Sequence, residues 1–259
     1  MATLAELVDL MMSVMWGMLR VTGLALIAPV LGSLMVPVRF RVLIGVALAV
    51  AMLPSLGSLP EYSPLSVLGL FTIAREIAIG MSIGFVLRLA VDAALIAGQI
   101  VSMGMGLAFA TVVDPNSGGV PLLGRFYVVI ATLLLLATNA HLMLIEVLAT
   151  SYSIMPIGTT GFGLPGVAAI AGFGAVMFAG AIHLALPAVI AILMVNIAFG
   201  VISRAAPTLN LFAVGFPVAI MMGFIVLVLS VTSQGVFWEG QTGAAFSLLT
   251  QLLEAGSGG

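Results

Sequence analysis

Long apolar runs without Asp, Glu, Lys or Arg dominate the chain. A membrane-spanning helix needs about 20 mostly apolar residues, and these runs are continuous, whereas strands of a membrane barrel alternate apolar and polar residues. Apolar residues between Leu4 and Met15 recur at helical spacing and predict a helix that leads into the first run. We therefore predict an all-α integral membrane protein with about six long hydrophobic helices arranged in hairpins. The runs cover residues 21–38, 42–60, 93–113, 126–145, 147–203 and 205–238.

Clusters of proline and glycine mark the expected connections between these helices. The run over residues 147–203 is too long for one span, and Pro156, Gly158, Gly161 and Pro165 crowd near its start. Both residue types oppose a continuous helix, so we expect a loop there. No linker divides the chain, which predicts a single membrane domain over residues 1–254 and a flexible tail or cloning remnant over residues 255–259. Further connections are expected at residues 37–41, 54–64, 113–125 and 204–210.

The composition narrows the function further. Of the 259 residues, 63% are hydrophobic and 6% are charged, whereas about a quarter of an ordinary soluble domain is charged. The net charge of −2 leaves no basic stripe for nucleic acid. The chain has no cysteine and its two histidines, His141 and His183, have no carboxylate at metal-ligand spacing, so we expect neither a metal nor a cofactor. No arrangement of a nucleophile with its base is present, and we expect no enzyme.

Four charged residues, Glu76, Arg88, Asp92 and Glu146, interrupt apolar sequence. Ionisable side chains at membrane depth are costly and usually face a bundle interior or a water-filled path. Arg88 and Asp92 are four residues apart, so they share a helix face and can neutralise each other. Arg75 and Glu76 are adjacent and point in different directions, so each needs another partner. Ion pairing between helices or subunits is the favoured interpretation, and a proton relay through Glu146 or Asp92 is the alternative.

Small residues recur at helix-packing spacing between residues 80 and 106. Gly80 and Gly84 form a GxxxG motif, and Gly98, Ser102 and Gly106 continue a row of small residues. Such rows let two helix backbones approach closely. The following sequence DPNSGGVP, residues 114–121, is rich in turn-forming residues. By composition alone it is interpreted as a surface hairpin loop, with a loop that folds inward and blocks a channel as the alternative.

Three segments, in the same order and spacing, carry a resemblance to a known family. The first is GFVLRLAVDAALIAGQIVSMGMGLAFATVVDPNSGG, residues 84–119, and the last is SRAAPTLNLFAVGFP, residues 203–217. Between them lie His141, Ser151, Tyr152, Pro156 and Gly158. In these segments the chain resembles the flagellar biosynthetic protein FliR family, the R subunit of the type III secretion export gate.

The resemblance implies a subunit of a channel for unfolded flagellar proteins in the bacterial inner membrane, within the flagellar basal body. It implies a closed helical assembly with FliP and FliQ, with FlhB and FlhA nearby. A FliP-like part would cover about residues 1–190, and a FliQ-like helical hairpin about residues 191–254.

The resemblance also implies roles for particular residues. A plug loop would contain Phe109, Asp114, Pro115, Asn116, Ser117, Gly118 and Gly119. Met103 and Met105 would supplement a methionine gasket contributed by FliP. Glu76, Arg88, Asp92 and Arg204 would serve buried ion pairing or assembly, and Gly80, Gly84, Gly98 and Gly106 would serve helix packing.

Two other functions remain open on the residues alone. A stand-alone, proton-coupled secondary transporter would act without partners and would be expected to show inverted repeats, which are not evident in the sequence. A membrane enzyme acting on lipid would need a cluster of His, Asp or Glu near one interface.

Overall fold

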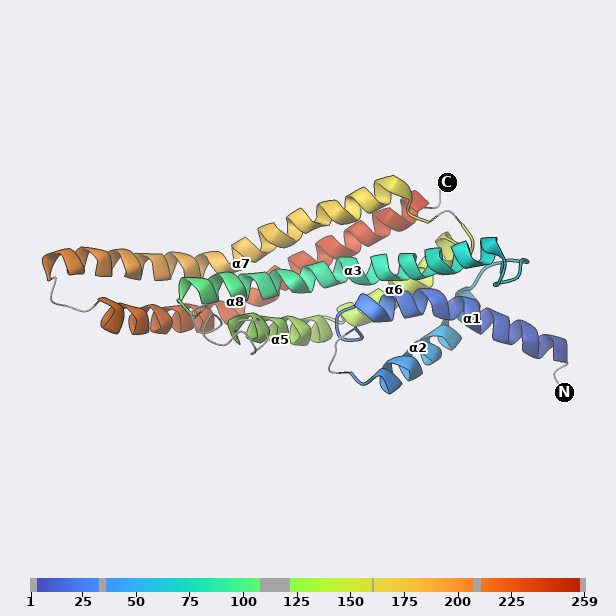
Figure 1. The fold of residues 1–259 in the computed structure, drawn as a ribbon, viewed down its shortest axis with the longest axis horizontal. Helices are drawn as coiled ribbons and strands as arrows, with labels where there is room; N and C mark the ends of the chain where they lie inside the picture. Colours follow the sequence, from blue (N-terminus) through green and yellow to red (C-terminus); the bar gives the residue numbers. More distant parts are fainter. Residues whose placement is uncertain (1–3, 33–35, 108–121, 160, 207–210, 257–259) are drawn as a thin grey trace. The chain divides into compact units, whose positions relative to one another are not determined.

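The computed structural model describes the chain except for residues 1–3, 33–35, 108–121, 160, 207–210 and 257–259 (Figure 1). All regular structure in the described residues is helical, which confirms the predicted all-α class. The elements are α1 (Leu4–Ile27), α2 (Val38–Met52), the short 3-10 helix η1 (Leu53–Ser55), α3 (Val67–Gly104), α5 (Leu122–Ala137), α6 (Ala140–Ile154), α7 (Gly163–Ala205) and α8 (Leu211–Gly256).

The helices are apolar enough to cross a membrane, as the sequence predicts. Four of the described helices meet the length and hydropathy of a span, and the number rises to six if each of two bent pairs counts as one. The four are α1, α2, α3 and α7, and the bent pairs are α5 with α6 and the two halves of α8. The expected number of about six hydrophobic helices is therefore confirmed.

The chain divides into two compact units, and three long helices contribute to both. Unit 1 comprises residues 1–89, 139–174 and 242–259, and unit 2 comprises residues 90–138 and 175–241.

In unit 1, α1 crosses the first half of α3 at very short distance, because Gly23 faces the backbone of Ile77 and Gly80 faces the backbone of Arg20. Gly84 continues this contact against Leu24 and Ala28. The predicted GxxxG motif thus lies at the α1–α3 crossing.

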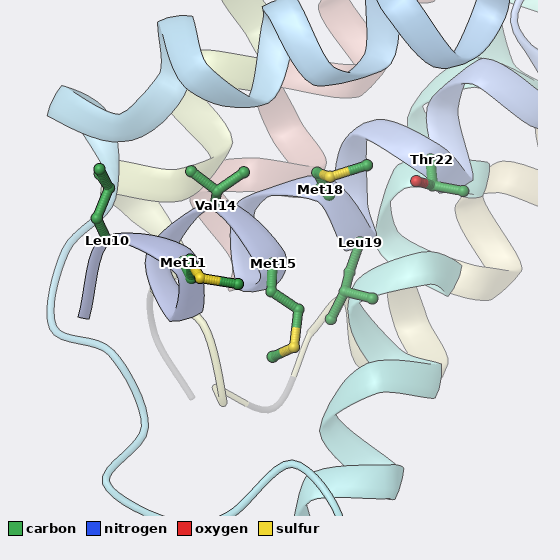
Figure 2. A pocket seen from close by; sticks show the side chains of 7 residues that line it. All are labelled: Leu10, Met11, Val14, Met15, Met18, Leu19 and Thr22. Atoms are coloured by element: carbon green, nitrogen blue, oxygen red, sulfur yellow. The ribbon is translucent and has the colours of Figure 1, made fainter. Parts of the chain in front are cut away.

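One outer face of α1 in unit 1 carries an open apolar groove of about 540 Å³ (Figure 2). Its lining comes from successive turns of α1, from Leu10 to Thr22, and Thr22 is the one polar residue among them. The lining residues are Leu10, Met11, Val14, Met15, Met18, Leu19 and Thr22.

In unit 2 the second half of α3 packs against α5 and α8, and α7 forms a hairpin with α8. Gly98 of α3 lies against the backbone of Gly124 at the start of α5, where an added Cβ would come within 2.7 Å of the Gly124 Cα. Met105, just after α3, fills the space above Gly223 of α8. In the hairpin, Gln241 of α8 covers Gly180 of α7.

Several helix limits differ from the predicted ones. The connection expected at residues 37–41 is wrong, because α2 begins at Val38 directly after Pro37, whose missing N–H is not needed at a helix start. The run over residues 126–145 is broken at Asn139, whose φ of 58° is left-handed, and α6 begins after it. The charges of α3 do not interrupt it: Arg75, Glu76, Arg88 and Asp92 all lie within one helix of 38 residues.

Gly106 ends α3 instead of continuing its row of packing residues. Its φ of 75° is left-handed, its N–H bonds the carbonyl of Met103, and the Leu107 N–H bonds the carbonyl of Ser102. This pair of hydrogen bonds is a Schellman cap, which commonly uses glycine at this position. Gly106 therefore lies outside the helix, at its C-terminal end.

Candidate functional site

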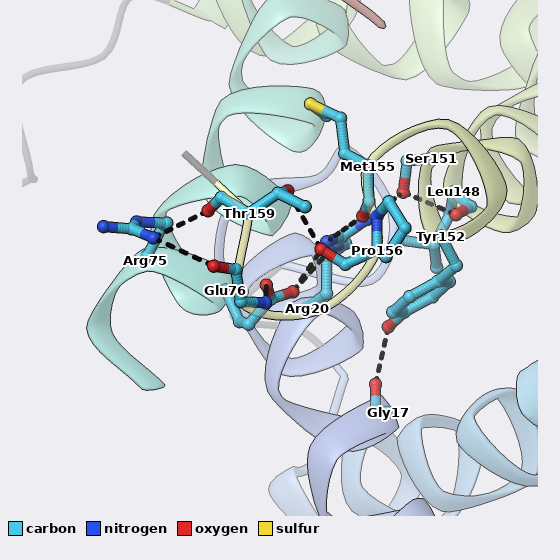
Figure 3. A network of polar contacts seen from close by, with 11 residues as sticks. Gly17, Arg20, Arg75, Glu76, Leu148, Ser151, Tyr152, Met155, Pro156 and Thr159 are labelled. Carbon is cyan, nitrogen blue, oxygen red and sulfur yellow. Dashed lines mark hydrogen bonds and ion pairs between the residues drawn. The ribbon is translucent and has the colours of Figure 1, made fainter. Parts of the chain in front are cut away.

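A buried cluster of polar groups joins α1, α3 and α6 in unit 1 (Figure 3). Arg20 of α1 and Glu76 of α3 are both fully buried and form an ion pair, with 2.7 Å between the Arg20 Nη2 and the Glu76 Oε2. The Arg20 Nε also donates to the same oxygen at 2.8 Å. This two-point contact holds the planar guanidinium in one orientation, and the α1–α3 crossing at Gly23 and Gly80 brings the two side chains together.

The remaining donors of Arg20 bind the end of α6. The Arg20 Nη1 donates to the Ser151 Oγ at 2.9 Å, and the Arg20 Nη2 donates to the Met155 carbonyl at 2.9 Å. The ring of Tyr152 lies under the guanidinium, with its centroid 4.4 Å from the Arg20 Cζ, and its hydroxyl donates to the Gly17 carbonyl at 2.6 Å. One arginine therefore donates to a carboxylate, a hydroxyl and a helix-terminal carbonyl, all of them buried.

The loop between α6 and α7 is held by the same segment of α3. The Arg75 Nη1 donates to the Thr159 carbonyl at 2.7 Å, and the Gly158 N–H points at the Glu76 Oε1 at 3.4 Å. Gly158 has a φ of 96°, a conformation that side-chain-bearing residues rarely adopt. Arg75 and Glu76 thus have different partners, on the loop and on α1 respectively.

The described contacts of this cluster are between groups of the chain itself, so its role is to join helices. The Glu76 carboxylate is fully buried, is paired with Arg20 and accepts hydrogen bonds from described groups of the same unit. Among the described residues, no group of three or more His, Cys, Asp or Glu side chains could hold a metal ion. The cluster joins three helices and one loop to each other through these contacts.

The other candidate residues do not converge on one place. Met103 is 67% exposed, whereas Met105 is buried against α8. Arg88 is exposed and Asp92 is half-buried, one turn apart on α3. Arg204 is exposed in the last turn of α7, where its positive charge interacts favourably with the helix dipole.

The remaining candidates are the plug residues and Glu146. The proposed plug residues, Phe109 and Asp114 to Gly119, lie outside the described residues. Glu146 is exposed in the middle of α6, which extends from Ala140 to Ile154.

Sequence reasoning missed Arg20 as part of a site. It stands at the edge of an apolar run, where an arginine is usually a boundary residue in contact with lipid headgroups. The available signal was Glu76, a carboxylate within apolar sequence that requires a cation elsewhere in the chain. Arg20 is one of seven basic residues, all arginine, and spacing alone could not single it out.

Comparisons with known proteins show which family the chain is similar to. The family model described as bacterial export proteins, family 1, matches residues 11–245. The chain is 33% identical over 239 residues to the flagellar biosynthetic protein FliR of Escherichia coli strain K12, covering 92% of this chain and 91% of that protein. It is 32% identical over 251 residues to FliR of Pectobacterium carotovorum, covering 96% and 95%. It is 28% identical over 227 residues to FliR of Bacillus subtilis strain 168, covering 86% and 87%.

Proposed function

Because the chain belongs to the FliR family of bacterial export proteins, we propose that it is a non-enzymatic subunit of the flagellar type III export gate. The family membership, which the sequence motifs predicted, makes the chain a membrane component of the flagellar export apparatus. We further propose that the chain, together with FliP and FliQ, forms the channel through which unfolded flagellar proteins cross the inner membrane. FlhB and FlhA are the further partners that we propose.

The observation that carries this proposal is the length and exposure of α7. It has 43 residues and no charged residue before Arg204, so it would extend for about 64 Å at 1.5 Å per residue. The hydrocarbon core of a bilayer is about 30 Å thick and covers only half of such a helix. Only 17% of its most apolar window is buried within the chain. The remaining apolar surface needs a protein cover, which a hetero-oligomer supplies and a solitary transporter does not.

The same reasoning applies to α3. It has 38 residues and would extend for about 57 Å. In the proposed assembly, about residues 1–190 form a FliP-like part and about residues 191–254 a FliQ-like hairpin. Charged side chains such as Arg88 and Asp92 then face neighbouring protein instead of lipid, where ionised groups are far less costly.

The segment after α3 is proposed as the plug of the channel. The capped end of α3 at Gly106 and the start of α5 at Leu122 bound this segment on both sides. The proposed plug residues are Phe109, Asp114, Pro115, Asn116, Ser117, Gly118 and Gly119. Gly118 and Gly119 can change backbone conformation with little strain, and an apolar Met and Phe collar can exclude water without holding a passing chain tightly.

Deletion of residues 116–119 tests the plug. We expect the complex to assemble normally and the membrane to leak small ions, because the barrier is lost while the helices remain. The measurement is ion conductance of the purified complex in planar bilayers, with the intact complex as the reference. If the complex with the deletion assembles and keeps the conductance of the intact complex, the plug assignment is contradicted.

Exchange of Arg88 and Asp92 tests whether the two side chains are partners in the assembly. Each single change, Arg88→Asp or Asp92→Arg, should lower the yield of complex more than the exchange, since the exchange keeps one charge of each sign. A pair on an exposed helix contributes about 0.2–0.5 kcal/mol, whereas breaking a buried pair costs about 3–5 kcal/mol. Quantified recovery of FliP and FliQ with the tagged chain measures the difference. An exchange as harmful as either single change shows that the two are not simply each other's partners.

A further inference from the structure

We propose that unit 2 binds structural water in its interior, at the carboxamide of Gln234 in α8 and at the hydroxyl of Ser102 in α3. Both residues belong to unit 2, and their exposed fractions are 1% and 0%. Within the described part of the chain, the Gln234 Nε2 and Oε1 and the Ser102 Oγ have no hydrogen-bond partner. The inference does not depend on the channel, its plug or the partner subunits.

The buried polar side chains of unit 1 show the contrast. Arg20, Glu76 and Ser151 are joined by hydrogen bonds, and Thr72 donates to a carbonyl of its own helix. Among the described groups of unit 1, the buried side-chain atom without a partner is the Nδ1 of His141, a residue that is only partly buried. Because buried polar groups in proteins are nearly always hydrogen-bonded, the two fully buried side chains of unit 2 require partners as well.

Ser102 lacks the hydrogen bond that helical serines commonly make within their own helix. Inside an apolar interior, a hydroxyl without a partner makes serine less favourable than alanine. A bound water molecule would restore the missing contacts, since it can both donate and accept. Six other helical serines donate to a carbonyl three or four residues earlier: Ser13, Ser82, Ser151, Ser203, Ser230 and Ser247.

The carboxamide of Gln234 has both a donor and an acceptor to satisfy. A flip of the amide would exchange Nε2 and Oε1 and would satisfy neither, because both positions lack a partner in the described structure. Gln241, two turns later on α8, likewise has an Oε1 that no described group binds. Gly235 is half-exposed, and a Cβ added there would meet nothing within 4 Å, so a small molecule can approach this turn of α8.

The chemistry of these groups selects water over an ion or a polypeptide. Glutamine and serine are uncharged, and each offers a donor and an acceptor, as water does. A hard cation would need about six oxygen ligands, and the described residues hold no cluster of three or more acidic, histidine or cysteine side chains. A partner polypeptide cannot contact side chains that are buried within the chain itself.

Radiolytic footprinting of the purified complex tests the site at Gln234. X-ray pulses convert bound water into hydroxyl radicals, which oxidise the nearest side chains, and mass spectrometry measures the oxidation of each peptide. The reporter is Trp238, one turn after Gln234, and its reference is Trp16 of unit 1; both tryptophans are 1% exposed. We expect Trp238 to be oxidised several-fold faster than Trp16. Equal rates for the two tryptophans would overturn the site.

Gln234→Leu shows whether Gln234 holds the water. It should lower the oxidation of Trp238 to the level of Trp16, because the apolar side chain offers no hydrogen bond. Gln251→Leu is the matched control, since it makes the same change at an exposed glutamine of α8 and should leave both rates unchanged. A Trp238 rate that Gln234→Leu leaves unchanged, or that both variants lower equally, would contradict the assignment.

Two methionines test the site at Ser102 in the same experiment. Met105 lies three residues after Ser102, and Met155 is its reference in unit 1; both are 1% exposed. We expect faster oxidation of Met105, and Ser102→Ala should lower it to the rate of Met155. Ser82→Ala is the control, because the Ser82 hydroxyl already donates to the Ala78 carbonyl of α3. Equal rates for the two methionines, or a loss that Ser82→Ala reproduces, would overturn this site.

Discussion

Replacing Arg20 by methionine should lower the free energy of unfolding by about 3–5 kcal/mol, since it leaves the Glu76 carboxylate fully buried without its cation. The double variant Arg20→Met with Glu76→Met should be more stable than Arg20→Met alone, because two apolar side chains of similar volume remove the buried charge. The double variant should remain less stable than the unchanged protein, because the Met155 carbonyl loses its hydrogen-bond donor, at a cost of about 1–3 kcal/mol.

A double-mutant cycle measures this coupling. Thermal unfolding of the detergent-purified complex is followed by size-exclusion chromatography of the fraction that remains folded. Arg125→Met serves as the control, since Arg125 is an exposed arginine of unit 2, and it should change stability by a few tenths of a kcal/mol at most. If the two single changes simply add, Arg20 and Glu76 contribute independently and the cluster does not hold α1 against α3.

Replacing Gly80 by alanine should destabilise unit 1 by about 1–3 kcal/mol or more. A Cβ at position 80 would collide with the Arg20 carbonyl of α1, and backbone on both sides leaves no flexible side chain to yield. The change would force the α1–α3 crossing apart and lengthen the Arg20–Glu76 contact that depends on it.

Gly45→Ala is the matched control for this variant. Gly45 lies in α2 of the same unit and an added Cβ there meets nothing within 4 Å. Alanine should therefore be neutral or stabilising by up to about 1 kcal/mol, the difference in helix propensity. Equal loss of stability in the two variants would show that glycine at position 80 matters for reasons other than close packing. The same thermal measurement applies to both.

The helical class and the number of apolar helices could be predicted because hydrophobicity is a property of each residue and its run length. The limits of the helices were less accessible. The predicted connection began at Pro37, whereas Pro37 is the last residue before α2. Asn139 interrupts an apolar run because its backbone is left-handed, and the neighbouring residues give no sign of this. These helix limits depend on the backbone conformation of single residues. The hydrophobicity of a run of twenty residues does not reveal that conformation.

The candidate site was predictable only in part. Glu76 was identified because a carboxylate in apolar sequence is conspicuous, but its partner Arg20 lies 56 residues away and is brought near by the crossing at Gly23 and Gly80. Gly106 was interpreted as a packing residue because its spacing fits, although it caps α3. The pairing of distant residues depends on where helices cross, and a single sequence does not show this directly.

We propose that the apolar helices of this chain are covered by other polypeptides around a shared channel. The native mass of the tagged chain, extracted from membranes that express the whole flagellar export apparatus, tests this most directly. We predict a stable complex of this chain with FliP and FliQ, and no folded monomer. A well-behaved monomer that transports a small solute in liposomes without partners would contradict the claim.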